Sequence, residues 1–310
     1  MTLALLCSGQ GRQHPAMFDL TGAAVAAQPL FVHAAGLLRD EPRRWIGTRG
    51  SAELHANRPA QLLCTLQALS AAAALADVLG PLRLCVAGYS VGEVAAWGVA
   101  GLLTGAAALD LVEARAVLMN EARHGEQGML FVRGLPRALV DACCAGRDAA
   151  VAIINPGDAL VLGGARADLE TIAQDALQQG ASRVVPVGVD VASHTRLMAA
   201  AVAPFRERLA AAAAAPAPRP GVRLFSGIDG ATVLNVTTGL DKLAAQLAAP
   251  VDWAACLEAC VETGATAFLE LGPGRALAEM AAGAYPQLPA RSLDDFRSLD
   301  GARRWIVQMT

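Results

Sequence analysis

The sequence predicts an α/β fold in two parts: a large domain built on a largely parallel sheet, and a small inserted subdomain of ferredoxin-like order. In the first 125 residues, short apolar runs that end in glycine turns alternate with helical segments, which is typical of a parallel sheet covered by helices. A strand–helix–strand–strand–helix–strand order follows, which is the ferredoxin-like pattern. Hydrophobic residues make up 54% of the 310 residues and charged residues 17%, so the chain can bury a substantial core.

The large domain opens with an apolar strand over residues 3–7, which ends in the turn Ser8-Gly9-Gln10-Gly11. A second apolar strand over residues 83–87 leads through a glycine turn into a helix. Periodicity and breaker residues predict the remaining elements of this domain: helices over 59–79, 91–100, 105–122, 194–214, 240–248, 253–263 and 272–282, and strands over 222–225 and 267–271.

The small subdomain is predicted from the middle of the chain. Its expected elements are strands over 129–133, 149–154, 159–162 and 183–187, and helices over 136–144 and 167–179. The turn Asn155-Pro156-Gly157-Asp158 joins the two central strands. We therefore divide the chain into a large α/β catalytic domain, residues 1–125 and 189–310, and a ferredoxin-like small subdomain, residues 126–188.

Composition excludes several classes of partner. The net charge of −3 and the scattered arginines argue against nucleic acid, which needs clustered positive charge. The longest charge-free run lies between Arg58 and Asp77 and contains polar residues, so it indicates a buried helix and not a membrane span.

The seven cysteines show no C-x-x-C pair and no zinc-ligand spacing, so reduced thiols, no metal and a cytoplasmic location are expected. The N-terminus lacks the basic lead of a signal peptide.

A candidate nucleophile, Ser90, lies in the motif Gly88-x-Ser90-x-Gly92 between an apolar strand and a helix. The turn is so tight that the flanking positions tolerate almost no side chain, and its strain lifts the hydroxyl clear of the sheet. The next backbone N–H then points at a developing oxyanion, and the helix adds its positive N-terminal end. A bare G-x-S-x-G also arises by chance, but the strand–turn–helix context favours an α/β-hydrolase-like large domain with Ser90 as its nucleophile.

The candidate base is His194, one of five histidines. It ends the segment Val191-Ala192-Ser193-His194, after a strand-like run and at the start of a predicted helix. An α/β-hydrolase has the order Ser, acid, His, with a late histidine, yet no histidine follows residue 194 here. Asp190 is the only acid close to this base. A standard esterase therefore fits poorly.

Six segments in chain order resemble one family, the malonyl-CoA:acyl carrier protein transacylases together with the acyltransferase domains of fatty acid and polyketide synthases. The resemblance runs nearly end to end, so it is more specific than any single motif. The matching segments are Ser8-Gly9-Gln10-Gly11-Arg12-Gln13, Gly88 to Glu93, Val112-Glu113-Ala114-Arg115 with Met119-Asn120-Glu121-Ala122, Val191 to His194, Gln246 to Trp253, and Leu269-Glu270-Leu271-Gly272-Pro273-Gly274.

The resemblance implies a role for each matching residue. Ser90 is the acylated nucleophile, and His194 is the general base and later the acid. The carbonyl of Gln246 orients the imidazole in place of a carboxylate. The backbone N–H groups of Gln10 and Val91 form the oxyanion hole.

Arg115, expected on a polar position of its helix, is implied to hold the free carboxylate of a malonyl group, which suits a planar guanidinium. The sequence departs from the family pattern at Ser8, which replaces proline, and at Tyr89, which replaces the histidine before the nucleophile. Tyr89 and Asn155 are expected to line the cleft.

The resemblance implies a ping-pong transfer of malonyl from malonyl-CoA to the thiol of an acyl carrier protein, without a cofactor of the enzyme's own. The small subdomain would cover the cleft and exclude water. Docking of an acidic carrier is expected at arginines, without a ranking among the candidates. These are Arg12, Arg58, Arg123, Arg196 and Arg275.

The sequence leaves alternatives for the metabolic pathway and for the functional class of the protein. The departures at Ser8 and Tyr89 look more like the epsilon subunit of a malonate decarboxylase, whose other subunits would then be partners, than like an enzyme of fatty acid or polyketide synthesis. A carboxylester or thioester hydrolase and a non-catalytic carrier-binding scaffold are the alternatives from other classes, although an intact Ser90 and His194 argue against the scaffold.

Overall fold

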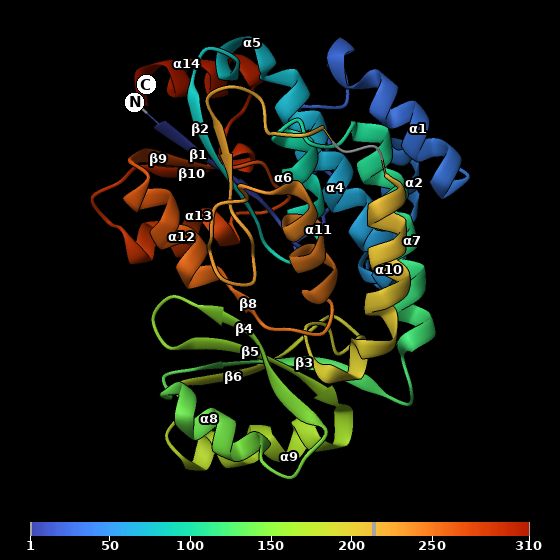
Figure 1. Cartoon of the computed structure of the whole chain (residues 1–310), viewed down its shortest axis with the longest axis vertical. Coiled ribbons are helices and arrows are strands. Elements are labelled where there is room, and N and C mark those ends of the chain that lie inside the picture. Colours follow the sequence, from blue (N-terminus) through green and yellow to red (C-terminus); the bar gives the residue numbers. More distant parts are fainter. Residues whose placement is uncertain (1, 213–214, 310) are drawn as a thin grey trace.

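A computed structural model describes residues 2–212 and 215–309 of the chain (Figure 1). Its larger part is built on a five-stranded sheet of order β10-β9-β1-β2-β7, in which every neighbouring pair is parallel. The strands are β1 (Thr2–Cys7), β2 (Arg83–Gly88), β7 (Val222–Leu224), β9 (Ala265–Glu270) and β10 (Ala290–Ser292). Because parallel strands place their carboxyl ends at one edge, the turns after β1, β2 and β9 meet there.

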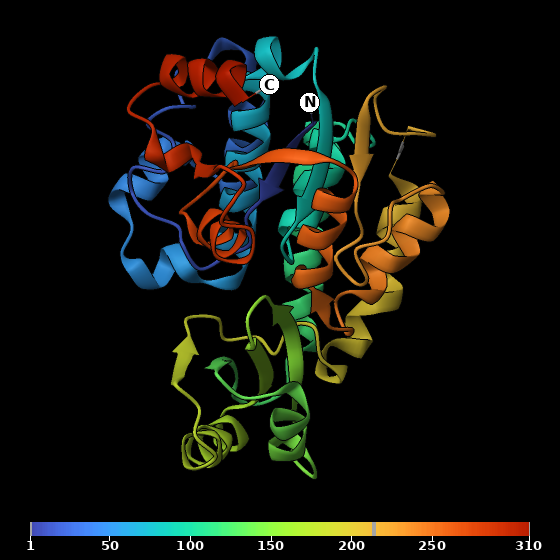
Figure 2. The same cartoon turned by 90° about the vertical axis from the view of Figure 1, so that its left-hand side faces the viewer.

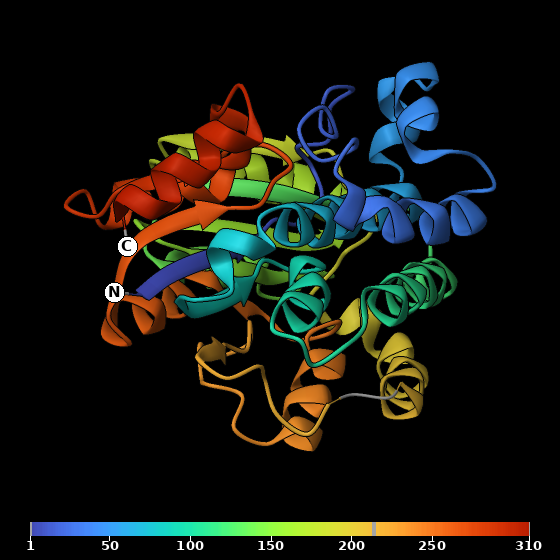
Figure 3. The ribbon, with the colours of Figure 1, turned by 90° about the horizontal axis from the view of Figure 1, so that it is seen from above.

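Helices cover both faces of this sheet, as the view from above shows (Figure 3). The central strand β1 is accordingly apolar after its first residue, Thr2, and Leu3 to Cys7 are fully buried. The helices of this part are α1 (Gln28–Leu38), α2 (Pro42–Thr48), α3 (Ser51–His55), α4 (Asn57–Ala74), α5 (Ala76–Leu79), α6 (Gly92–Val99), α7 (Gly105–Ala122), α10 (Ala199–Ala211), α11 (Val236–Ala245), α12 (Trp253–Glu262), α13 (Ala276–Ala284) and α14 (Leu299–Met309). This arrangement confirms the predicted α/β class with a parallel sheet.

The second sheet has the order β6-β3-β5-β4-β8, and its first four strands are antiparallel in the ferredoxin-like arrangement. These strands are β3 (Gln127–Arg133), β4 (Ala149–Asn155), β5 (Ala159–Ala165) and β6 (Arg183–Val187). Helices α8 (Arg137–Cys144) and α9 (Arg166–Gln178) cover one face and share a separate apolar core with it (Figure 2). The other face is turned toward the large sheet (Figure 2).

The fifth strand of the small sheet, β8 (Val251–Asp252), comes from the C-terminal half of the chain and pairs in parallel with β4. This pairing ties the segment before α12 to the small sheet. A two-residue strand carries no readable alternation, so the sequence did not reveal it. The division of the chain at residues 126 and 188 stays a prediction.

The expected helix over 194–214 is wrong at its start. His194 has a φ of 63°, in the left-handed region, and its N–H donates to Leu247 O at 2.9 Å, so it lies in a turn. A short 3₁₀ turn over Arg196–Met198 follows, and α10 begins at Ala199. The last two residues of the expected helix, 213 and 214, lie outside the described residues.

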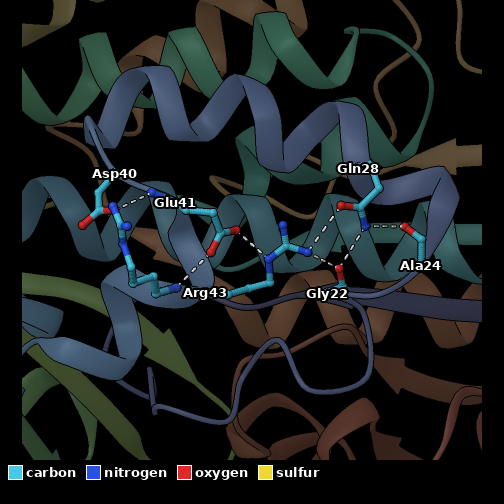
Figure 4. Close-up of polar contacts among 7 residues, drawn as sticks. Gly22, Ala24, Gln28, Asp40, Glu41 and Arg43 are labelled. Carbon is cyan, nitrogen blue, oxygen red and sulfur yellow. Dashed lines mark hydrogen bonds and ion pairs between the residues drawn. The ribbon is translucent and has the colours of Figure 1, made fainter.

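The N-terminal helices α1 to α3 had no prediction from the sequence. A polar network around Arg43 holds the loop before α1 against α2 (Figure 4). Arg43 donates to Gly22 O, to Gln28 Oε1 at 3.3 Å and to Glu41 Oε1 at 2.5 Å, while its guanidinium lies 4.4 Å from the Phe31 ring centroid. Among the described residues, no helix has the length and apolar character that crossing a membrane requires.

Candidate active site

Ser90 occupies a sharp turn between β2 and α6. Its φ of 56° is left-handed, which is strained for a residue with a side chain. A Cβ on Gly88 would come within 2.2 Å of Glu93 N, and a Cβ on Gly92 within 2.1 Å of Cys7 O. Both flanking glycines are therefore sterically required, as the motif predicted.

His194 lies against this serine although 104 residues separate them, with Ser90 Oγ 2.7 Å from His194 Nε2. On the other side of the ring, Nδ1 is 2.6 Å from the main-chain carbonyl oxygen of Gln246. A carbonyl only accepts hydrogen bonds, so Nδ1 carries the proton and Nε2 is free to accept from the serine hydroxyl. This is the tautomer that a general base needs.

Burial, with a smaller effect from the positive charge of Arg115, lowers the pKa of His194 to about 3, against the opposing effect of the hydrogen bond to Gln246. The side chain is 1% exposed. The imidazole is therefore neutral at pH 7 and ready to take a proton.

Two backbone amides near Ser90 have free donor capacity. Gln10 follows β1 and lines the cavity beside Ser90, and Val91 is the residue after the nucleophile. Within residues 2–212 and 215–309, neither amide N–H donates to a protein acceptor. The loop with Gln10 packs on the serine turn, since a Cβ on Gly9 would lie 2.8 Å from Tyr89 O.

Arg115 was expected on the polar side of its helix, but its side chain is buried. It is 2% exposed on α7 and donates from Nη1 to Gln61 Oε1 at 2.5 Å. Burial lowers its pKa to about 10, against the opposing effect of the Glu93 carboxylate. Its Nη2 is buried and has no partner among the described residues, so the guanidinium keeps an unused donor. Arg115 is not among the residues that line the cavity over Ser90.

A cavity of about 620 Å³ opens over Ser90 and His194. One wall is the free face of the small sheet, with Phe131, Val161 and Val185 among its apolar residues. The facing wall is formed by the loops that follow β1, β2 and β9 and by one side of α13.

Both residues expected to line the cleft do so. Tyr89 packs edge-on against the buried Trp253, with ring centroids 5.4 Å apart. Asn155 is 5% exposed, and its side-chain amide lies beside the Tyr89 hydroxyl, whose pKa it lowers against the larger opposing effect of burial. The cleft therefore contains a buried amide close to the nucleophile's turn.

Most of the arginines predicted for carrier docking form ion pairs on the surface. These pairs are Arg58–Glu113, Arg123–Asp190, Arg196–Asp148 and Arg275–Asp295. Arg12 lines the cavity and has no ion pair among the described residues. It is therefore the one member of the set that combines a place at the cleft with an uncompensated charge.

Sequence reasoning missed Arg133 and Arg183, which also line the cavity. They lie directly opposite each other on β3 and β6, and neither has an ion pair in the described part of the chain. Like charges in this relationship are unfavourable unless a counter-charge is bound. Strand alternation, which places Arg133 on the face of Met129 and Phe131, was the available signal.

Two buried carboxyl groups were missed as well. Glu93 Oε2 accepts from Gly227 N at 2.9 Å and from Gln246 Nε2, and burial raises the pKa of Glu93 to about 8. Glu270 accepts from Ser8 Oγ at 2.7 Å and from Ala278 N at 2.9 Å, and burial raises its pKa to about 8. The serine that departs from the family pattern thus hydrogen-bonds to the glutamate of the last motif.

The arrangement is suited to acyl transfer: a serine hydroxyl, a neutral histidine that can accept its proton, and free amides nearby. The described residues contain no cluster of three or more His, Cys, Asp and Glu side chains that could hold a metal ion.

Comparisons with known proteins agree with this chemistry. Residues 48–295 match the family described as "Acyl transferase domain". The malonyl CoA-acyl carrier protein transacylase of Mycobacterium bovis is 34% identical over 308 residues, which cover 96% of this chain and 98% of that protein.

Among solved structures, the acyl-carrier-protein S-malonyltransferase of Burkholderia pseudomallei has a TM-score of 0.90 at 28% identity, covering 98% of this chain and 100% of its own. A malonyl-transacylase in complex with its type II PKS acyl-carrier protein has a TM-score of 0.90 at 25% identity, covering 98% and 99%. The chain is therefore an acyltransferase that belongs to the malonyl CoA-acyl carrier protein transacylase family.

Proposed function

We propose that this enzyme transfers a malonyl group from malonyl-CoA to the phosphopantetheine-type thiol of an acyl carrier protein. The observation that carries the proposal is the contact of Ser90 Oγ with His194 Nε2 at 2.7 Å, in a chain that belongs to the transacylase family. The malonyl-transacylase seen with its carrier protein supports the choice of acceptor.

In the first half-reaction, His194 Nε2 takes the proton of Ser90 as Oγ attacks the thioester carbonyl carbon. The N–H groups of Gln10 and Val91 stabilise the oxyanion of the tetrahedral intermediate. The carbon–sulfur bond then breaks, and the imidazolium returns its proton to the departing CoA thiolate. The products are CoA and an ester on Ser90.

The second half-reaction reverses these steps with the carrier. His194 accepts the proton of the carrier thiol, whose sulfur attacks the ester carbonyl carbon. When the tetrahedral intermediate collapses, the Ser90 oxygen leaves and regains a proton from the imidazolium. The malonyl group is then a thioester of the carrier protein, and the enzyme returns to its starting state without a cofactor.

Arg115 is the group that we propose for the malonyl carboxylate. Its unused Nη2 and its full burial support this role, because a desolvated guanidinium gains strongly from a bidentate carboxylate partner. The approach of this carboxylate would also offset the positive charge that lowers the pKa of His194.

The small sheet supports binding of a pantetheine arm. One row of cavity residues crosses its strands from Asn155 through Ala159 and Arg133 to Arg183. Three strand spacings of about 4.8 Å make this row roughly 14 Å long. An arm lying on the apolar face would bring its phosphate to the two arginines, which have no carboxylate partner among the described residues.

Hydrolysis of the same ester is the alternative reaction. The apolar sheet face over Ser90 supports transfer, because it favours an arm over free water. Parallel double-reciprocal lines for donor and carrier, with little free malonate, are expected of the transferase. Rapid turnover of p-nitrophenyl esters with no transfer from malonyl-CoA would instead establish a hydrolase.

For the pathway, we propose the epsilon subunit of a malonate decarboxylase, which loads a dedicated carrier protein; the alternative is fatty acid or polyketide synthesis. The departures at Ser8 and Tyr89 support this choice, since both take part in specific contacts, with Glu270 and Trp253. The enzyme is expected to load the decarboxylase carrier with a higher kcat/KM than a fatty acid carrier, and to bind other decarboxylase subunits. An equal or reversed preference would contradict the assignment.

A further inference from the structure

Glu93 lies three residues after the nucleophile, yet the chemical steps above do not use it. It belongs to the first turn of α6 and is 1% exposed. Its backbone N–H donates to Ser90 O at 2.9 Å, while its carboxyl Oε2 accepts from Gln246 Nε2. One residue therefore contacts both the serine turn and the residue that holds the histidine.

We propose that Glu93 is a positioning residue that fixes the Gln246 peptide and, through it, the ring of His194. This inference rests on the proposed Ser90–His194 mechanism. It supplies a buried acid to a site in which, among the described residues, no carboxyl group hydrogen-bonds to the His194 ring. The acid acts one residue further away, through an amide side chain and its own main-chain carbonyl.

Gln246 is held at three points. Its N–H donates to Lys242 O at 2.9 Å at the end of α11, its side chain donates to Glu93, and its carbonyl accepts from His194 Nδ1 at 2.6 Å. The residue is 1% exposed. Without Glu93, the buried Nε2 group would lose its acceptor, which favours reorientation of the residue.

A third segment closes around the carboxyl group. Gly227 N donates to Glu93 Oε2 at 2.9 Å, and a Cβ on Gly227 would lie 2.5 Å from that oxygen and 2.7 Å from Gln246 Nε2. Gly227 O accepts in turn from Asp252 N at 2.8 Å. Because no side chain fits at position 227, the backbone can approach the carboxyl group, and the contact joins α6, α11 and the loop after β7.

The positioning role requires an acceptor oxygen and no negative charge. A protonated carboxyl group still accepts through Oε2, which agrees with a pKa of Glu93 raised to about 8 by burial. Glutamine at this position also presents an acceptor oxygen, whereas alanine does not. The two substitutions therefore separate positioning from charge.

The test compares Glu93→Gln and Glu93→Ala, with Glu113→Ala on α7 as a control that removes a carboxylate outside the site. Acylation rates are measured with malonyl-CoA and acetyl-CoA, and ¹⁵N-histidine spectra report the Nδ1–H of His194. We expect Glu93→Gln and Glu113→Ala to stay within about threefold of wild type. Glu93→Ala should lower kcat by about 10²-fold for both donors, the size of a general-base contribution, with little change in KM.

The spectra distinguish this role from simple structural damage. In Glu93→Ala, the single Nδ1–H tautomer of His194 should give way to a mixture, while Glu93→Gln keeps it. If Glu93→Ala does not fold, Gly227→Ala tests the same contact and should show both effects. An unchanged His194 signal in folded Glu93→Ala or Gly227→Ala, equal losses in the Gln and Ala variants, or a loss confined to malonyl-CoA would overturn the proposal. The spectra remain readable if no acyl group is transferred, so this outcome is separate from failure of the proposed function.

Discussion

His194 donates from Nδ1 to the main-chain carbonyl of Gln246, 2.6 Å away, and not to a carboxylate. A carbonyl fixes the tautomer, but it stabilises an imidazolium less than an ionised aspartate does. Burial and, to a lesser extent, the positive charge of Arg115 hold the pKa of this base at about 3 in the free enzyme. A bound malonyl carboxylate would relieve that effect, so the base would gain proton affinity when the correct acyl group is present.

Removing Arg115 should therefore raise the pKa of His194 toward its ordinary value. The sign follows from the charge, because a nearby cation disfavours the imidazolium. The measurement is a ¹⁵N-histidine titration from pH 4 to 8 of wild type and Arg115→Ala, with Arg123→Ala at the end of the same helix as control. Unchanged titration in Arg115→Ala would show that burial alone sets this pKa.

The same variant should discriminate between acyl groups. Arg115→Ala is expected to lose malonyl transfer by about 10²-fold or more, in line with a buried charged contact of about 3 kcal/mol. Acetyl transfer should suffer much less, because acetyl has no carboxylate to bind. Transfer rates from the two CoA thioesters check this, and equal losses would mean that Arg115 is structural.

Arg133 and Arg183 should matter only for donors that carry phosphate. Arg133→Ala and Arg183→Ala are each expected to raise KM for malonyl-CoA by about tenfold, the loss of one charge-assisted contact. They should leave transfer from malonyl-pantetheine, which lacks phosphate, unchanged. Arg137→Ala, an arginine on α8 paired with Asp141, is the matched control. Equal effects on both donors would contradict a phosphate site.

The sequence predicted best those features that depend on the steric requirements of a few neighbouring residues. The glycines around Ser90 predict a turn that no other residue tolerates. The place of His194 after a strand-like run indicated the candidate base, and the absence of any later histidine argued against an esterase triad. The predicted start of α10 was wrong because a left-handed residue in a buried turn produces no periodic pattern in the sequence.

Other features depend on contacts between distant segments, so no local pattern reveals them. Arg115 lies on a helix buried on more than one side, and its 2% exposure comes from α4 packing against α7. Arg133 and Arg183 lie opposite each other because of the register between β3 and β6, which the sequence does not show. Glu93 depends on a partner 153 residues away.

Glu270 provides a prediction for stability. Its pKa is about 8 in the folded chain against an ordinary value of 4.5, so the folded chain binds this proton more tightly than the unfolded chain. The resulting contribution to the stability of the fold is complete below pH 4.5 and is lost as the pH rises through 8. Glu270→Gln lacks this titration. Thermal unfolding at pH 5, 7 and 9 gives the free energy of unfolding of both proteins. From pH 5 to pH 9, this free energy should rise by about 1 kcal/mol or more in the variant relative to wild type. The exposed Glu126→Gln is the control, and parallel curves for Glu270→Gln and wild type would contradict the burial effect.

The intact mass of the enzyme after mixing with malonyl-CoA tests the central claim most directly. The account predicts one malonyl adduct, located on Ser90 by peptide mapping, which disappears when the holo carrier protein is added. Ser90→Ala should form no adduct, and His194→Ala should form it far more slowly. Absence of an adduct in the wild-type enzyme, together with undiminished transfer by Ser90→Ala, would contradict a malonyl-serine intermediate.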